Sequence, residues 1–349
     1  MSYTNGLDKP SDYFSTKLYT GNGSDNHTIT GVGFQPDMIW IKERSSTSSH
    51  YLTSVGLGIG TRLEPNETSA EATEGISAVT SDGFTIGTST NQVNENGQTY
   101  VSWNWKAGTS FTNDASSTGI GTIDSTGSVS DTAGFSIVSY TGTGSNGTIK
   151  HGLSTVPKIM IVKERDNANN WFVYHYSLGA TKQLILQETD AEASFTATWN
   201  DTEPTSSVFS VGTSNGTNRS GGGLIAYCFA EKKGYSKFGS YIANSNSSNF
   251  IYTGFKPAFL MVKQTDSGGN QNWGMFDNKR PGYNSQNGFL YANTNGAEDT
   301  SNATSIDLLS NGFQLRANTV GSNPGKSYIY MCFASNPLVT STGVPTTAR

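Results

Sequence analysis

The chain has 349 residues and a formal net charge of −5, and 14% of its residues are Asp, Glu, Lys or Arg, against a usual share of about 25%. Ser, Thr, Asn and Gly make up 159 residues, a composition that weakens helices, while 11% aromatic residues argue for a folded chain. The acidic balance speaks against nucleic-acid binding, and no apolar run is long enough to span a bilayer. Residues 1–14 lack the basic and apolar regions of a secretory signal, so we expect none.

One sequence unit occurs three times along the chain. The first two copies open with Phe14 and Phe135, each followed five residues later by Tyr-Thr-Gly, and the third opens at Phe238. In every copy a proline heads an apolar run that ends in a lysine, and a glutamate beside alanine follows. Each copy closes with an aromatic strand, at residues 100–107, 224–230 and 328–334.

The repeat predicts an all-β chain of three tandem, related β-sandwich domains of the jelly-roll or lectin-like kind, because each copy is long enough to bury its own core. The predicted boundaries are 1–12 for an N-terminal arm, 13–107, 135–231 and 236–335 for the three β-sandwich repeats, 108–134 for a linker and 336–349 for an extended C-terminal arm. The linker has one alternating stretch that could form an extra strand. The second and third repeats are joined too closely for a flexible linker, so we expect them to pack together.

Short apolar runs indicate the central strand of each unit. Residues 38–41, 159–162 and 259–262 are continuous apolar stretches, typical of strands that are buried on both faces. The charged residues that follow them are expected to lead out to solvent. Only residues 108–121 and the C-terminal arm are expected to be flexible.

Two sets of recurring residues are candidate ligand contacts. Trp171 and Trp273 follow the central strands, where a ring could stack on a sugar, although we favour a place in the core for both. Lys42, Lys163 and Lys263 end the central strands, where they could contact a ligand, although a lysine that keeps a strand edge soluble is the commoner use.

A recurring glutamate, at Glu71, Glu192 and Glu298, suggests the acid of a glycosidase. Such an enzyme needs a second carboxylate beside the first, and none recurs with these. We therefore expect them to cap turns or to pair with Arg62 or Lys182, and we expect no catalytic residue.

The remaining chemistry-bearing residues predict neither a metal site nor a cofactor. The histidines have no metal-ligand spacing and are expected on the surface or in turns; they are His27, His50, His151 and His175. Cys228 and Cys332 occupy equivalent places in two copies, so they are expected to be free thiols, in keeping with synthesis in a reducing compartment.

Several motifs together resemble a family of repeat proteins of tailed, mainly marine, bacteriophages. They are Tyr-Thr-Gly-x-Gly-Ser at 140–145, Gly-Phe-x-Pro-x-(apolar)4-Lys at 33–42, and the segments 170–179, 204–212, 226–230, 234–241 and 332–337. The resemblance covers about 13–337 and implies a virion structural protein, often labelled tail-fibre-like, with no catalytic residues to carry over. The third copy departs from the pattern because it lacks the Tyr-Thr-Gly-x-Gly turn, which argues against equal ligand binding by all three copies.

These observations predict a surface-exposed tail-fibre or appendage component that is made in the bacterial host cytoplasm and takes part in host-surface attachment. Its expected partners are other virion proteins, further copies of itself and a bacterial surface glycan or receptor, with no nucleic acid and no membrane insertion. Pro337, Val344 and Pro345 mark the C-terminal segment as a candidate assembly arm. The alternative is a capsid decoration, head-fibre or other scaffold protein without a receptor role, and a more remote one is an envelope-polysaccharide hydrolase.

Overall fold

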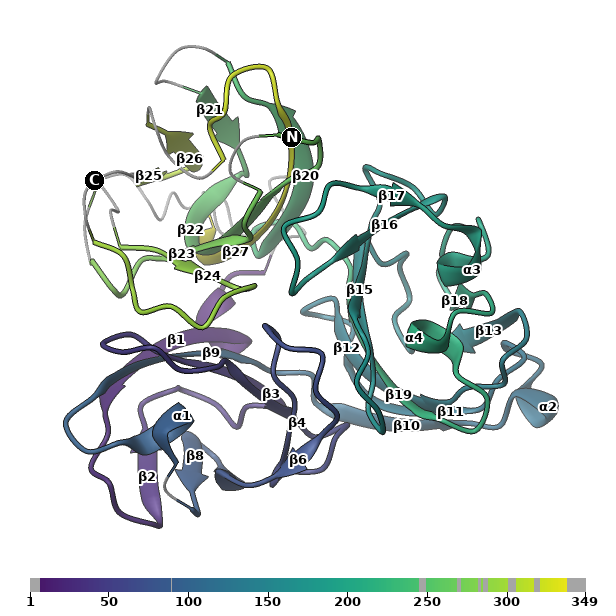
Figure 1. The fold of residues 1–349 in the computed structure, drawn as a ribbon, viewed down its shortest axis with the longest axis horizontal. Helices are drawn as coiled ribbons and strands as arrows, with labels where there is room; N and C mark the ends of the chain where they lie inside the picture. Colours follow the sequence, from purple (N-terminus) through teal and green to yellow (C-terminus); the bar gives the residue numbers. More distant parts are fainter. Residues whose placement is uncertain are drawn as a thin grey trace.

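The structure is a computed structural model that describes residues 7–337 apart from 89, 245–248, 269–270, 282–283, 285–287, 301–305 and 317–320. Antiparallel strands form most of it, and the predicted all-β fold class is confirmed. We call residues 14–107 unit 1, residues 135–231 unit 2 and residues 236–337 unit 3. Figure 1 shows the three units arranged around a common centre.

Unit 1 follows a 3-10 turn, η1 (Pro10–Asp12). Its elements are β1 (Phe14–Thr20), β2 (His27–Thr30), β3 (Met38–Glu43), β4 (Tyr51–Ser54), β5 (Thr61–Arg62), β6 (Ala72–Thr73), β7 (Ile76–Thr80), β8 (Gly83–Ile86), α1 (Asn91–Asn94) and β9 (Thr99–Trp105).

The linker and unit 2 come next. Their elements are β10 (Thr109–Asn113), α2 (Ala115–Thr118), β11 (Ser125–Ser130), β12 (Phe135–Thr141), β13 (Gly147–Lys150), β14 (Ile159–Glu164), β15 (Trp171–His175), β16 (Lys182–Ile185), β17 (Ala193–Ser194), α3 (Thr196–Trp199), β18 (Val208–Val211), α4 (Asn215–Asn218) and β19 (Gly223–Phe229).

Unit 3 completes the fold. Its elements are β20 (Ser236–Ile242), β21 (Asn249–Tyr252), β22 (Phe255–Gln264), β23 (Gly274–Asp277), β24 (Leu290–Tyr291), β25 (Ile306–Leu309), β26 (Gly312–Leu315) and β27 (Ser327–Pro337).

The same strand order occurs in each unit. The larger sheet has the order β1-β9-β3-β4 in unit 1, β12-β19-β14-β15 in unit 2 and β20-β27-β22-β23 in unit 3. A smaller sheet completes each sandwich, with the orders β2-β8-β7, β13-β18 and β21-β26-β25. In each unit the closing strand therefore lies between the first strand and the central strand.

The linker is more ordered than its sequence suggested. It supplies two strands, because β10 and β11 extend the larger sheet of unit 2 beyond β12. Helix α2 lies between them in the segment that we expected to be flexible. The Asp114 side chain accepts a hydrogen bond from Ser117 N at its start, and Gly119 at its end has a positive φ of 67° that suits glycine.

The central strands β3, β14 and β22 are buried on both faces, as predicted. Their charged ends are buried too, so the predicted exit to solvent is wrong: Lys42 and Glu43 are 0% and 1% exposed. Pro257 also lies within β22, at an irregularity of its pairing with β27, rather than ahead of the strand.

Each larger sheet has two apolar faces. One face packs on the smaller sheet of the same unit and forms a separate core in each unit. The opposite faces of all three larger sheets meet in one shared core, to which unit 1 contributes Trp103, unit 2 Ile161 and unit 3 Met331. Since every unit buries one apolar face of its larger sheet against the other two units, the three units form one body and not a chain of independent domains.

Candidate functional site

Recurring polar residues lie at the three junctions between the units. Each recurring glutamate donates its backbone N–H to the carbonyl oxygen two residues after the recurring lysine of the neighbouring unit. The pairs are Glu71 with Arg165 (2.8 Å), Glu192 with Thr265 (2.9 Å) and Glu298 with Arg44 (2.8 Å). Unit 1 thus binds unit 2, unit 2 binds unit 3, and unit 3 binds unit 1, so the contacts close a ring.

The glutamate side chains add ion pairs at two junctions. Glu298 binds Arg44 at 2.8 Å, and Glu71 binds Arg165 at 2.6 Å. The third junction has a threonine in place of the arginine, and there Glu192 pairs with Lys182 at 3.4 Å within its own unit.

The predicted pairing of the recurring glutamates is therefore correct for Lys182. It is wrong for Arg62, which binds Glu64 and Glu74 instead. In the described residues the three glutamates lie at separate junctions, and none faces another as the two carboxylates of a glycosidase must.

Trp171 and Trp273 are 0% and 2% exposed and lie at two junctions. The indole N–H of Trp171 donates to the carbonyl oxygens of Glu64 (3.0 Å) and Glu67 (3.1 Å) in unit 1. The indole N–H of Trp273 donates to Ile185 O in unit 2 at 3.0 Å. Both rings therefore belong to the core, the interpretation that we favoured, and neither offers a face to a surface glycan.

At the third junction, the register of β3 with β4 places His50 where the other units have tryptophan. His50 Nδ1 accepts a hydrogen bond from the Trp40 indole N–H at 2.8 Å, so the proton of the neutral ring lies on Nε2. Nε2 donates to Tyr291 O and Thr294 O of unit 3, at 3.0 and 3.1 Å. Burial lowers the pKa of His50 to about 3, with the Lys42 charge as a further cause.

A side-chain amide completes every junction in the same way. Its oxygen accepts the backbone N–H of the tryptophan or histidine just described. The pairs are Asn66 with His50 (2.7 Å), Gln187 with Trp171 (3.0 Å) and Asn293 with Trp273 (2.9 Å).

The recurring lysines are fully buried, so they do not keep a strand edge soluble. Lys42 and Lys163 each donate to the next residue's carbonyl oxygen at 2.6 Å, and Lys263 donates to Thr189 O of unit 2 at 3.1 Å. Burial lowers the pKa of Lys42 and Lys163 to about 8 and that of Lys263 to about 7. Like the tryptophans, these side chains are not accessible to a surface ligand.

A surface location, one of the two places expected for the histidines, is wrong for three of the four residues, although His50 and His151 do lie in connections between strands. His50, His151 and His175 are at most 1% exposed, while His27 is partly exposed and its Nδ1–H donates to Asn94 Oδ1 at 2.8 Å. Burial lowers the pKa of His151 to about 4 and that of His175 to about 3.

Both cysteines are free and buried in the cores of different units. Burial raises the pKa of Cys228 to about 12 and that of Cys332 well above its usual value. Neither thiol is therefore prepared for nucleophilic chemistry.

Of the predicted assembly arm, only the start is described. Strand β27 continues through Pro337, which pairs with Phe255, so the arm begins later than position 336. Val344 and Pro345 lie outside the described residues.

A groove of about 560 Å³ lies beside the junction of units 1 and 2. Hydroxyl side chains of the linker hairpin and β12 line it, among them Thr112, Thr126 and Ser139, with Asp37 and Arg165 as its charged residues. The apolar side chains of Val55 and Phe111 line it as well, so its lining is mixed.

The described residues contain neither a metal-binding cluster nor a membrane-spanning helix. No group of three or more His, Cys, Asp or Glu residues there could hold a metal ion. No helix in that part of the chain is long and apolar enough to cross a bilayer.

Comparison with known proteins gives one family. A family model described as a domain of unknown function, DUF7483, matches residues 9–337. The chain belongs to this family. The DUF7483 match spans all three units, the linker and every junction described above. No curated protein matches the chain.

Two kinds of residue in this DUF7483 chain were not predicted from the sequence. Arg44 and Arg165 follow the recurring lysines, but the partner that each one binds lies in another unit. Phe250 and Tyr252 are 44% and 58% exposed on β21. The sequence did contain a signal for their exposure. Ile251 aligns with a buried isoleucine in both other units, so its two neighbours on the strand must point outward.

Proposed function

We propose that the chain is a structural protein of a bacteriophage particle, a surface-exposed tail-fibre or appendage component that takes part in host attachment. The observation that carries this proposal is the use of the recurring polar residues. In all three junctions the glutamate backbone N–H and the tryptophan or histidine ring bind carbonyl oxygens of the neighbouring unit around the shared core, and the amide binds the tryptophan or histidine from within its own unit. A site for chemistry would instead leave such groups accessible to a substrate.

The resemblance of the repeat motifs to phage repeat proteins supports the same proposal. Lys263, which ends the apolar run in the third copy, and Trp171, in the segment that begins at Asn170, donate hydrogen bonds to a neighbouring unit. Residues of the motifs that carry the resemblance therefore take part in closing the ring. A rigid three-unit body suits an exposed particle component, since it resists local opening.

A second candidate is a capsid decoration or scaffold protein without a receptor role. The arrangement of three similar units around one centre favours it, because such a body could sit on a threefold axis of a larger assembly. The polysaccharide hydrolase is the least supported candidate, because the recurring glutamates bind arginine, lysine or backbone groups.

Quantitative mass spectrometry of purified particles of the encoding phage tests the proposal. We expect the chain in the particles at a low copy number relative to the major capsid protein, as for a tail component. A copy number comparable to that of the capsid protein would favour the decoration role. Absence from the particles would contradict both.

A further inference from the structure

Strand β21 of unit 3 presents two aromatic rings to solvent. Phe250 and Tyr252 alternate along the strand with Ile251, which is 8% exposed and packs in the core of unit 3. Alternate residues of a strand point to opposite faces. The two rings therefore lie on the outer face of the smaller sheet.

The neighbouring strand β26 leaves room for these rings. Gly312 lies opposite Tyr252, and Gln314 lies opposite Phe250. A Cβ atom at Gly312 would come within 3.0 Å of Phe250 Cε2, so the Phe250 ring extends over this glycine. On the outer face, the two rings therefore form an apolar surface beside Gly312, which has no side chain of its own.

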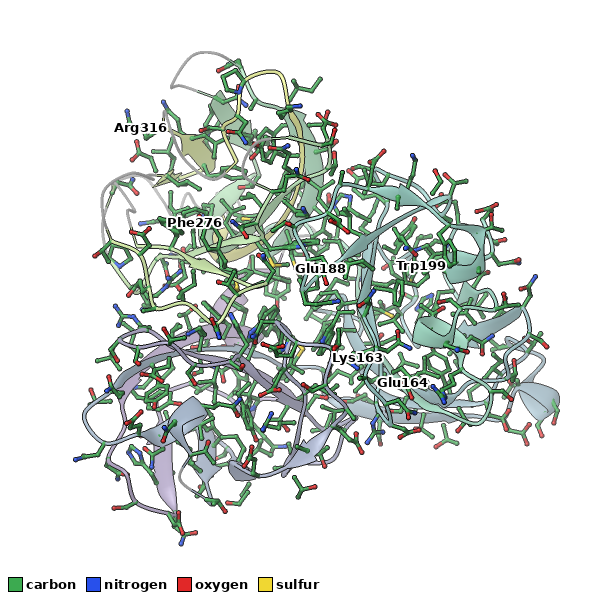
Figure 2. The ribbon with its side chains drawn as sticks, in the orientation of Figure 1. Lys163, Glu164, Glu188, Trp199, Phe276 and Arg316 are labelled. Atoms are coloured by element: carbon green, nitrogen blue, oxygen red, sulfur yellow. The ribbon has the colours of Figure 1, made fainter. Side chains whose placement is uncertain are left out.

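Polar groups border the rings on the same face. Gln314 and Arg316 alternate with Leu315, which is buried in the unit 3 core. Arg316 forms an ion pair with Asp307, which lies opposite Gln314 on β25. Figure 2 shows Arg316 on the periphery of unit 3, far from the shared core.

The equivalent faces of units 1 and 2 lack the aromatic, amide and guanidinium side chains, although unit 1 has a glycine, Gly83, at the place of Gly312. The inward isoleucine is the same in the three units, at Ile29, Ile149 and Ile251, and it faces a phenylalanine each time, at Phe84, Phe209 and Phe313. The outward positions of Phe250 and Tyr252 are Thr28 and Thr30 in unit 1 and Thr148 and Lys150 in unit 2. Counted from the same phenylalanine, the positions of Gln314 and Arg316 are Thr85 and Gly87 in unit 1 and Ser210 and Gly212 in unit 2.

Four outward positions therefore differ together in unit 3 while the inward positions are kept. The sandwich forms in units 1 and 2 without the aromatic pair, the amide and the arginine, so the fold does not need them. Single exposed aromatic residues are common, but two rings side by side on one exposed face form an apolar patch of the kind that marks a binding site.

We propose that this outer face of β21 and β26 is a carbohydrate-binding site, with Phe250 and Tyr252 as the stacking surface. A pyranose ring has an apolar face that packs on aromatic rings and a rim of hydroxyl groups that need hydrogen-bond partners. The Gln314 amide, the Arg316 guanidinium and the Tyr252 hydroxyl supply donors and acceptors beside the rings. Because Arg316 is already paired with Asp307, the site suits an uncharged sugar.

The source of the sugar rests on the proposed function: it is a neutral polysaccharide of the bacterial envelope. This site replaces the two tryptophans as the candidate for glycan binding, because both tryptophans are buried. It assigns the ligand to one unit of the three, in agreement with the departures of the third repeat from the common pattern.

The test uses the full chain on a printed array of bacterial O-antigen and capsular polysaccharides, followed by calorimetric titration of the best-bound neutral polysaccharide. The double variant Phe250→Thr, Tyr252→Thr installs the residues that unit 1 carries, so its fold is already compatible with the sheet. We expect it to bind at least about tenfold more weakly, the loss typical of removing a central aromatic contact. The matched control Thr28→Ala, Thr30→Ala in unit 1 should bind as the unmodified chain does.

Binding to no polysaccharide on the array, or equal binding by the threonine variant, would overturn the site. An adsorption assay separates this outcome from a failure of the proposed function. If the unmodified chain and the threonine variant block phage adsorption equally, the attachment role stands and the site is wrong. If the unmodified chain binds a polysaccharide but does not block adsorption, the site stands and the attachment role is wrong.

Discussion

The indole hydrogen bond of Trp171 gives a direct prediction about the junctions. Trp171→Phe removes an N–H that donates to two carbonyl oxygens of unit 1, Glu64 O and Glu67 O, and leaves an aromatic ring in the same place. A buried hydrogen bond contributes about 1 kcal/mol, and leaving its partner unsatisfied raises the loss to about 1–3 kcal/mol. The smaller ring adds a packing loss of its own.

Trp105→Phe is the matched control. Trp105 lies in the same shared core at 1% exposure, but its indole N–H has no hydrogen-bond partner among the described residues. Both variants therefore lose a similar ring volume, and the Trp105 variant also removes an unsatisfied donor. The difference between them isolates the hydrogen bond across the junction.

Urea unfolding followed by circular dichroism measures the two free energies of unfolding. We expect Trp171→Phe to be less stable than Trp105→Phe by about 1–3 kcal/mol. If the Trp105 variant loses as much stability as the Trp171 variant, or more, the hydrogen bond across the junction does not contribute as the structure implies.

Three further predictions follow from the burial of titratable groups. The pKa of His50 is lowered on folding from about 6.5 to about 3, so the unfolded chain takes up the proton first and stability falls as the pH drops below about 6.5. Between pH 7.5 and 5.5 the chain should lose about 1.4 kcal/mol through this residue, and the pH dependence of urea unfolding should be shallower by that amount in His50→Gln. Glu298→Gln should reduce the free energy of unfolding by about 2 kcal/mol more than Glu71→Gln, because Glu298 also binds the fully buried guanidinium of Arg280; equal losses in thermal melts would contradict this. Cys228 and Cys332 should react with a thiol reagent only after global unfolding and at the same rate, and a fast-reacting thiol in the native chain would show that one core opens alone.

The repeat, the fold class and the central strands could be predicted from the sequence. Runs such as residues 38–41 are apolar at every position, which predicts a strand buried on both faces. The turns between the runs are rich in glycine and asparagine, which predicts where the strands end. The ordered linker was also partly readable, since Asp114 and Gly119 are common helix-capping residues.

The burial of the charged strand ends could not be predicted from one repeat. Lys263 is buried because Thr189 O of a neighbouring unit accepts its hydrogen bond. His50 looked like a surface residue because its equivalence to Trp171 becomes visible only through strand register. In both cases the hydrogen-bond partner belongs to a neighbouring unit. Contacts between units cannot be predicted from the local pattern of apolar and polar residues.

The candidate carbohydrate site could be predicted only in part from the sequence. Phe250 and Tyr252 differ from the threonines of unit 1, which the sequence displays. Their exposure followed only when Ile251 was placed in the core, since a one-residue change of register exchanges the two faces of a strand.

The central claim is that the three units form one body around a shared core. Differential scanning calorimetry of the full chain tests it most directly, because a cooperative body gives one transition whose calorimetric enthalpy equals its van't Hoff enthalpy. We predict a single such transition, because unfolding any one unit would expose the inner faces of the other two. Two or three separate transitions, or a calorimetric enthalpy several times the van't Hoff value, would show that the units unfold independently and would contradict the claim.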